Sequence, residues 1–203
     1  MQGQLWIVAA PSGGGKTSLI AEAVRVLDNV VESVSHTTRA KRLGEVEGVH
    51  YYFVSSAHFQ SMVAADGFLE HAQVFHNAYG TAAAQVDALL AAGKDVILSI
   101  DWQGAQQVLD KRPETRSVFL LPPSLDILYE RLNARGQDHA AVVAQRMAEA
   151  EEQISHYRAF EFVIVNEDFQ QAAHELQMLI LAARLERRRC EADLQPLLQR
   201  LGQ

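Results

Sequence analysis

A short apolar segment, followed by a glycine-rich turn and a helical pattern, most constrains how this chain folds. Residues 5–10 form a continuous apolar run that ends at Pro11 and three consecutive glycines. Such a run is typical of a strand buried on both faces. Beyond the turn, apolar residues recur at helical spacing: Leu19, Ile20, Ala23, Val24 and Leu27. A strand, a tight turn and a helix in this order open an α/β unit.

The turn has the character of a phosphate-binding loop. Residues 10–17 approximate the pattern G-x-x-x-x-G-K-[ST], with Ala10 in place of the first glycine. Glycines let the backbone wrap around phosphate oxygens, and the positive end of the following helix faces them. We expect Lys16 to reach the β- and γ-phosphates of a nucleotide and the Thr17 hydroxyl to hold Mg²⁺. The expected nucleotide-binding residues of the loop are Ser12, Gly13, Gly14, Gly15, Lys16, Thr17 and Ser18. Such a loop fits GTPases, ATPases, motor proteins and small kinases alike.

Further apolar runs predict the rest of the architecture. Residues 95–100, 117–121 and 162–165 read as buried strands separated by helical patterns, which favours a parallel sheet with helices on both faces. The stretch from about residue 30 to residue 81 alternates β-branched and aromatic segments, and predicts a small mixed-sheet insertion outside that core. Two helical patterns between the last two strands, with Ser124 and Asp138 as expected N-caps, predict a mobile appendage.

Composition narrows the function classes. The chain has 203 residues and 48% hydrophobic content, enough for one domain with a sizeable core. A net charge of -7 argues against non-specific nucleic-acid binding, and no apolar run is long enough for a membrane helix. The single Cys190 and the lack of an export signal favour a reducing cytoplasm. We expect the late arginine run, at Arg184 and residues 187–189, to be a solvated helix end. The helix that carries this run could form an interface between copies of the chain or pack on the core, so the oligomeric state stays open.

A second basic segment follows the phosphate loop. Arg39 and Arg42 lie three residues apart beside the hydroxyls of residues 35–38, and Tyr51 offers a further donor. Guanidinium groups bind phosphate oxygens through two parallel hydrogen bonds, which lysine cannot reproduce. On residue chemistry alone, this segment is either a second phosphate site or a solvated basic loop.

Several motifs, taken in order, resolve that choice. After the phosphate loop come S-H-T-T-R-x-x-R, G-E-V-E-G-V-H-Y, F-L-E-H-A-Q-V-F, Y-G-T, I-D-W-Q-G-A, R-x(10)-R and I-S-H-Y. In this order, and over about residues 5–187, the chain closely resembles bacterial guanylate kinases.

The resemblance implies a fold and an activity. The fold is the P-loop nucleoside-monophosphate-kinase type: a parallel sheet flanked by helices, with a small mixed β insertion that binds GMP and a helical lid. It implies one domain over residues 1–203. Its core covers about residues 1–33, 89–123 and 159–203, its GMP-binding subdomain about 34–88, and its lid about 124–158. The implied reaction is ATP-dependent, Mg²⁺-assisted phosphorylation of GMP, and of dGMP, in purine nucleotide metabolism.

The resemblance also implies residue roles. The implied GMP-binding residues are Ser35, Arg39, Arg42, Tyr51, Glu70, Tyr79, Thr81 and Asp101. Among them, Glu70 and Thr81 would read guanine, since an ionised carboxylate accepts from the N1–H and the amine while a hydroxyl can donate to O6. The implied catalytic residues are Lys16, Arg42 and the two lid arginines, Arg135 and Arg146. Asn166 resembles the adenine-side contact of the family, although Glu167 follows it where the family usually has Asp.

Asp101 and Ser99 raise a separate question. Asp101 ends an apolar strand at the edge where doubly wound folds bind ligands, so it would hold Mg²⁺ through water, position the acceptor, or cap the next turn. Many guanylate kinases carry an acid two places earlier, where this chain has Ser99. We expect the serine to be tolerated because Glu70 and Asp101 remain.

Other functions stay open on the sequence alone. Guanylate kinase-like domains of scaffold proteins bind peptides without catalysis, and other P-loop kinases phosphorylate other nucleotides. A GTPase switch is not favoured, because the chain lacks an N-K-x-D-like motif.

Overall fold

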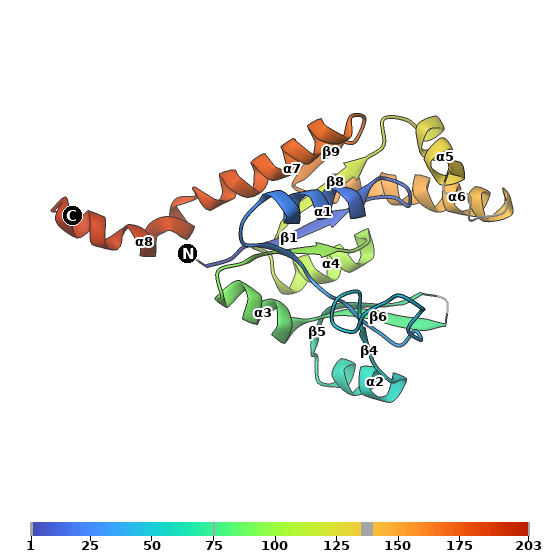
Figure 1. The fold of residues 1–203 in the computed structure, drawn as a ribbon, viewed down its shortest axis with the longest axis horizontal. Helices are drawn as coiled ribbons and strands as arrows, with labels where there is room; N and C mark the ends of the chain where they lie inside the picture. Colours follow the sequence, from blue (N-terminus) through green and yellow to red (C-terminus); the bar gives the residue numbers. More distant parts are fainter. Residues whose placement is uncertain (1, 75, 135–139, 203) are drawn as a thin grey trace.

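The computed structural model describes residues 2–74, 76–134 and 140–202 (Figure 1). Its centre is a five-stranded sheet in the order β2-β7-β1-β8-β9, and every neighbouring pair is parallel. The strands are β1 (Leu5–Ala9), β2 (Val30–Glu32), β7 (Asp95–Ser99), β8 (Arg116–Leu121) and β9 (Phe162–Val165). The expected parallel core is confirmed. The start of the insertion at about residue 30, as the residue pattern predicts, is wrong, because Val30–Glu32 pairs with β7 and extends the core sheet. The core segment of about residues 1–33 that the resemblance implies includes this strand.

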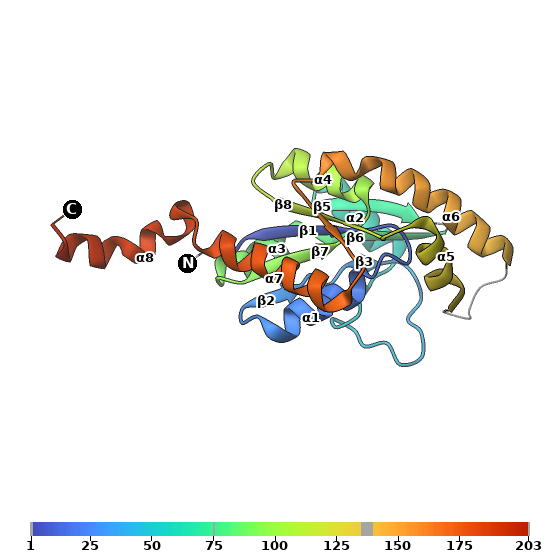
Figure 2. The same ribbon diagram turned by 90° about the horizontal axis from the view of Figure 1, so that it is seen from above.

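Both faces of this sheet are covered by helices, as alternate strand residues require. Trp6 and Val8 of β1 pack with α1 (Lys16–Val26) and α7 (Phe169–Arg184) on one face. Leu5 and Ile7 pack on the other face with α3 (Ala83–Ala91) and α4 (Trp102–Lys111). Figure 2 shows these layers from above. The carboxyl ends of the strands therefore meet at one edge, next to the turn that follows β1.

A second, mixed sheet is inserted between β2 and α3. It has the order β4-β3-β6-β5, in which β3 and β4 are parallel and the other pairs are antiparallel. The strands are β3 (His36–Thr37), β4 (Tyr52–Phe53), β5 (Phe68–Val74) and β6 (Asn77–Ala82). Helix α2 (Ser56–Ala64) packs on this sheet through the stacked rings of Phe59 and Phe68.

A helical pair lies between β8 and β9. It consists of α5 (Leu125–Ala134) and α6 (Ala140–Ser155), followed by a short 3-10 helix, η1 (His156–Ala159). The Ser124 hydroxyl accepts a hydrogen bond from the backbone N–H of Ile127, as expected for an N-cap. The other expected cap, Asp138, lies outside the described residues. In Figure 1 this pair and the mixed sheet lie toward the same end of the central sheet, on opposite sides of it.

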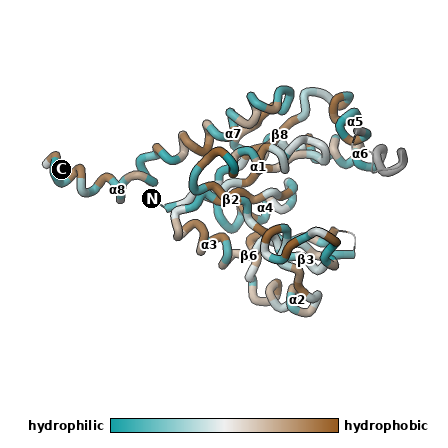
Figure 3. Tube along the Cα trace, viewed as in Figure 1, coloured by the Kyte–Doolittle hydropathy of each residue, from teal (hydrophilic) through white to brown (hydrophobic). Residues whose placement is uncertain are grey.

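The last helix, α8 (Arg187–Arg200), projects away from the body in Figures 1 and 2. Hydrophobic and hydrophilic residues alternate along it in Figure 3, and Leu194, Leu197 and Leu201 are exposed. Among the helices that the structure describes, none combines the length and apolar character needed to cross a membrane.

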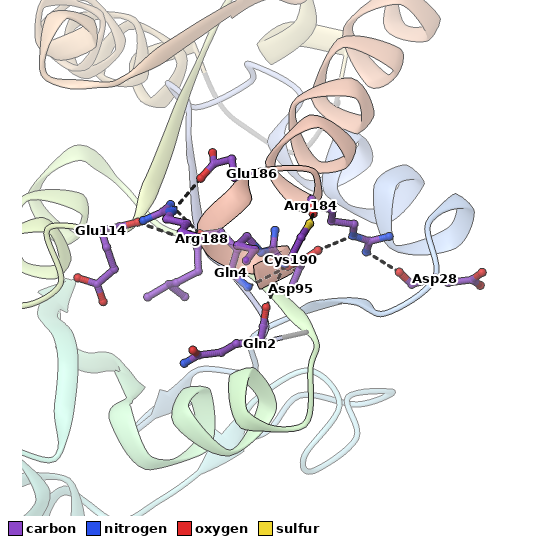
Figure 4. Close-up of polar contacts among 11 residues, drawn as sticks. Gln2, Gln4, Asp28, Asp95, Glu114, Arg184, Glu186, Arg188 and Cys190 are labelled. Atoms are coloured by element: carbon purple, nitrogen blue, oxygen red, sulfur yellow. Dashed lines mark hydrogen bonds and ion pairs between the residues drawn. The ribbon is translucent and has the colours of Figure 1, made fainter. Parts of the chain in front are cut away.

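Two members of the arginine run, Arg184 and Arg189, differ from the solvated helix end that the sequence predicts, whereas Arg187 is exposed as expected. Arg184 Nε and Arg189 Nη2 bind the two carboxylate oxygens of Asp95, at 2.8 and 2.6 Å, and both Asp95 and Arg189 are buried. The backbone N–H of Gln4 also donates to Asp95. Figure 4 shows this cluster where α7 gives way to α8. A buried carboxylate at the start of β7 needs cationic partners, and the run supplies them.

Candidate active site

The turn between β1 and α1 has the backbone that a phosphate loop requires. Gly13 and Gly15 have φ values of 86° and 93°, in the left-handed region that favours glycine. The Gly14 N–H donates to the Pro11 carbonyl at 2.9 Å, and α1 begins at Lys16. A Cβ atom on Gly13 would lie 3.1 Å from Leu128 of α5, so the helical pair packs directly against the loop.

Lys16 crosses from this loop to the end of β7. Its Nζ atom donates to the Ile100 carbonyl oxygen at 2.9 Å. Burial lowers the pKa of Lys16, and nearby carboxylates partly oppose this shift. These carboxylates belong to Asp101, Glu32 and Glu70. The ammonium group therefore lies where the phosphate loop meets a set of acids.

Asn166, at the end of β9, braces the same loop. Its side-chain Nδ2 atom donates to the Gly14 carbonyl oxygen at 2.9 Å, and its backbone carbonyl oxygen accepts from Arg131 Nη2 at 2.9 Å. Nη1 of Arg131 is buried without a hydrogen-bond partner in the part of the chain that the structure describes. The Asn166 amide is thus engaged with the loop backbone, a contact that the sequence did not predict.

Asp101 caps α4. Its Oδ1 atom accepts from the Gly104 N–H at 2.8 Å, which is the capping role among the alternatives considered. A Cβ atom on Gly104 would lie 3.2 Å from Glu70 Oε2, so glycine allows Glu70 to approach the start of this helix. Asp101 and Glu70 are close enough for the Asp101 charge to raise the pKa of Glu70.

Glu70 and Thr81 meet on adjacent strands of the mixed sheet. They are paired in the β5–β6 register, and the Thr81 hydroxyl donates to Glu70 Oε1 at 2.5 Å. Both side chains are buried. Burial raises the pKa of Glu70, and the Thr81 hydrogen bond acts in the opposite direction. The structure thus brings together the two residues to which the resemblance assigns the reading of guanine.

The arginine segment folds back on an acid that sequence reasoning missed. Glu45 accepts from both terminal nitrogens of Arg39, at 2.6 and 3.1 Å, and from the Arg42 N–H at 2.7 Å. These hydrogen bonds lower the pKa of Glu45 to about 2. The Arg39 guanidinium also lies over the Tyr51 ring, 5.4 Å from its centroid, and the Tyr51 and Tyr79 rings are 5.9 Å apart. Arg39 is therefore held in the two-pronged geometry with which it would bind a phosphate.

A cavity of about 330 Å³ joins the two halves of the site. Thr17 lines it from the phosphate loop, Ser35 and Tyr51 from the mixed sheet, and Glu32 and Ser99 from the ends of β2 and β7. A cavity of about 490 Å³ lies at the amino ends of the strands, but contains none of the expected site residues. Of these two cavities, the smaller one is lined by expected site residues.

Comparison with known proteins decides the family. The guanylate kinase family model matches residues 2–183. The chain belongs to the guanylate kinase family. A guanylate kinase from Saccharophagus degradans is 52% identical over 199 residues, which cover 98% of this chain and 97% of that protein. One from Legionella pneumophila strain Paris is 51% identical, over 90% of this chain and 88% of the relative. The crystal structure of guanylate kinase from Anaplasma phagocytophilum matches with a TM-score of 0.71 and 32% identity, over 91% of this chain and 88% of that one.

The remaining expected site residues fall into three groups. Arg146 lies half-buried on α6, in the described part of the helical pair, whereas Arg135 lies outside the described residues. Arg42 is exposed, and its backbone is hydrogen-bonded to Glu45 through both its N–H and its carbonyl oxygen. Ser12 lies in the loop, and Thr17 and Ser18 are exposed in the first turn of α1.

The oxygen-bearing side chains around the cavity suit Mg²⁺. The Thr17 hydroxyl is exposed at the start of α1, and the cavity beside it also holds the Glu32 carboxylate and the Ser99 hydroxyl. Mg²⁺ prefers such hard ligands and commonly combines one or two protein oxygens with substrate phosphates and waters. The residues present therefore fit the metal that the family implies.

Proposed function

We propose that this chain transfers the γ-phosphoryl group of ATP to GMP and releases ADP and GDP. The observation that carries the proposal is the buried Glu70–Thr81 pair beside Lys16. The carboxylate matches the N1–H and amine donors of guanine, and the Thr81 hydroxyl, which now donates to Glu70, would donate to O6 once it turns toward the base. Adenine has no N1–H and carries an amine in place of O6, so it would leave buried polar groups unpaired.

The acceptor phosphate would bind at the other end of the mixed sheet. Arg39, Arg42, Ser35 and Tyr51 supply donors there, with Tyr79 beside Tyr51. The GMP phosphate would replace Glu45 as the partner of Arg39, because two of its oxygens can accept the two hydrogen bonds that the Glu45 carboxylate accepts now. The GMP phosphate is already anionic, so an oxygen of it attacks the γ-phosphorus without a strong base, as the bond to the β–γ bridging oxygen breaks.

The donor side is built from the phosphate loop. Its N–H groups and Lys16 would hold the β- and γ-phosphates, while the Gly14–Asn166 hydrogen bond keeps the loop in place. We assign Mg²⁺ to Thr17 directly and to Asp101 through water. When bound, the metal neutralises charge on the transferred group.

We further propose that residues 124–158 act as a lid over residues 34–88, the GMP-binding subdomain. Arg146, and Arg135 with it, would then reach the transferred phosphoryl group on closure, which also excludes water as a competing acceptor. Asn166 stays a proposed contact on the adenine side. We place the reaction in purine nucleotide metabolism in the cytoplasm, with no nucleic-acid or membrane partner, and leave homo-oligomerisation open.

One assay tests the function. Purified protein is given ATP and Mg²⁺ with GMP, dGMP, AMP, CMP or UMP, and ADP release is measured. We expect turnover with GMP and dGMP, and discrimination against AMP on the order of 10⁴ because its pocket contacts stay unpaired. A peptide-binding module would make no GDP, and a kinase for another nucleotide would prefer another acceptor. Either result would overturn the proposal.

A further inference from the structure

Strand pairing places the Glu32 carboxylate beside Ser99, in addition to that of Asp101. In the parallel register of β2 and β7, Glu32 is paired with Ile97, so their side chains lie on the same face of the sheet. Ser99 follows Ile97 by two residues and shares that face. Ile97 and Val30 pack with Leu19 and Ile20 of α1, which fixes the face as the one that α1 covers. Glu32 and Ser99 are therefore directed to the helix that begins with Lys16 and Thr17.

The cavity confirms this arrangement. Glu32 and Ser99 line the same space as Thr17 on the nucleotide side and Ser35 and Tyr51 on the acceptor side. Glu32 is solvent-accessible, yet the cavity walls desolvate it enough to raise its pKa. A hydrogen-bonding interaction with Ser99 and the charge of Lys16 oppose that shift. Glu32 thus reaches into the space between the expected donor and acceptor phosphates.

A carboxylate in that space needs a cation between it and the substrates. Two polyanions meet there, and an unscreened carboxylate would repel both. Lys16 is assigned to the donor phosphates, so it does not by itself neutralise Glu32 once ATP binds. Mg²⁺ keeps several of its waters in nucleotide sites, and these waters donate to carboxylates.

We propose that Glu32, oriented by the Ser99 hydroxyl, binds the water shell of the Mg²⁺ that accompanies ATP. Glu32 thereby supplies from β2 the carboxylate that many guanylate kinases carry at the position of Ser99 on β7. This assignment rests on the proposed function, and it adds a metal-positioning residue that the sequence analysis did not identify. Thr17 and Asp101 keep their roles.

The closing experiment separates metal binding from turnover. Affinity of a non-hydrolysable ATP analogue is measured by calorimetry with Mg²⁺ and with EDTA, for wild type, Glu32→Gln and the control Glu22→Gln. Glu22 lies on α1, and within the described part of the chain its carboxylate binds Arg25 on the same helix. Mn²⁺ binding to the same complexes is followed by electron paramagnetic resonance.

We expect Glu32→Gln to lose about tenfold or more in the affinity of the nucleotide complex for the metal, a loss typical of outer-shell partners. Without metal, its nucleotide affinity should be unchanged or higher, because a repelling charge is gone. Glu22→Gln should match wild type in both conditions. A drop in metal-free affinity would show instead that Glu32 acts by holding Lys16, and would overturn the proposal, as would unchanged metal affinity.

Moving the carboxylate from one strand to the other by mutation gives a second test. The double variant Glu32→Gln, Ser99→Asp moves the carboxylate from β2 to β7, and we expect it to recover most of the lost Mn²⁺ affinity. Failure to recover any of it would contradict the shared position of the two side chains. GDP formation by wild type is measured in parallel. If wild type makes no GDP, the proposed function fails; if it does and the metal readouts do not move, only the role of Glu32 fails.

Discussion

The Thr81 hydroxyl donates to Glu70 Oε1 across the β5–β6 pair at 2.5 Å, and both side chains are buried. This bond aligns the carboxylate before any ligand arrives. It also uses one acceptor site of Glu70, which leaves Oε2, beside Gly104, to face a guanine donor. The proposed guanine pocket is therefore organised in advance by two strands of the inserted sheet.

Glu70→Gln should weaken GMP but not ATP. The amide loses the charge-assisted hydrogen bonds, worth about 1.5–3 kcal/mol, or roughly 10- to 100-fold in affinity. Separate titrations of the two nucleotides measure this. Equal losses for both would place Glu70 outside the base pocket. Burial raises the pKa of Glu70, so keeping this group ionised in the folded state lowers the free energy of unfolding at neutral pH. The Gln variant lacks this penalty, and its unfolding temperature should be no lower than that of wild type.

The same residue predicts a pH dependence. In the proposed pocket GMP binds ionised Glu70, whose pKa burial raises, so protonation begins at a higher pH than for an ordinary glutamate. The KM for GMP should therefore rise as the pH falls through that raised value, by about tenfold per unit below it. The KM for ATP serves as the internal control. Glu70→Gln should remove the dependence, and persistence in the variant would assign it to another group.

Lys16→Ala should abolish most transfer while GMP still binds. Lys16 reaches the end of β7 from the phosphate loop, and its proposed place in the reaction is beside the donor phosphates. The kcat should fall more than about tenfold, or ~1.4 kcal/mol. Lys111→Ala, at the end of α4, is the matched control because Lys111 binds Asp66 and the Phe68 carbonyl oxygen, away from the phosphate loop. A variant that keeps most of its kcat would show that Lys16 does not stabilise the transferred charge.

The parts of the site that the sequence predicts are local or lie within a motif. Residues 10–17 act through their own backbone, so spacing and the flanking strand and helix are enough to predict them. Glu70 and Thr81 are found because two family motifs contain them. Arg39 and Arg42 are predicted as a pair for the same reason.

The parts that sequence reasoning missed depend on contacts between distant segments. Glu32 reaches Ser99 only because β2 pairs with β7, and the alternation of Val30 and Glu32 was the available signal. Glu45 binds Arg39 because the loop folds back. Asp95 pairs with two arginines that follow it by 89 and 94 positions, which no local pattern contains.

Asp95→Asn should destabilise the fold and spare catalysis. Its two oxygens accept from Gln4, Arg184 and Arg189, and an amide would turn a donor toward one of them. Breaking a buried pair in this way costs about 3–5 kcal/mol, or a melting temperature lower by on the order of 10 °C for this chain length. Calorimetry measures the shift, with the exposed Asp110→Asn as control. At 25 °C the kcat should be unchanged, since the cluster lies at the amino ends of the strands.

Asn166 offers the sharpest test of the donor side, because 152 positions separate it from the carbonyl of Gly14 that it binds. Asn166→Ala leaves that carbonyl without its donor, and Asn166→Asp sets a second acceptor against it near the phosphates. ATP affinity should therefore fall in the order wild type, Asn166→Ala, Asn166→Asp, with a loss of about 1–3 kcal/mol for the first change. GMP affinity should stay constant. Inorganic tripolyphosphate separates the two roles of the residue: if Asn166 acts by bracing the loop, its variants bind tripolyphosphate more weakly too, whereas a contact with adenine alone would leave tripolyphosphate binding as it is in wild type.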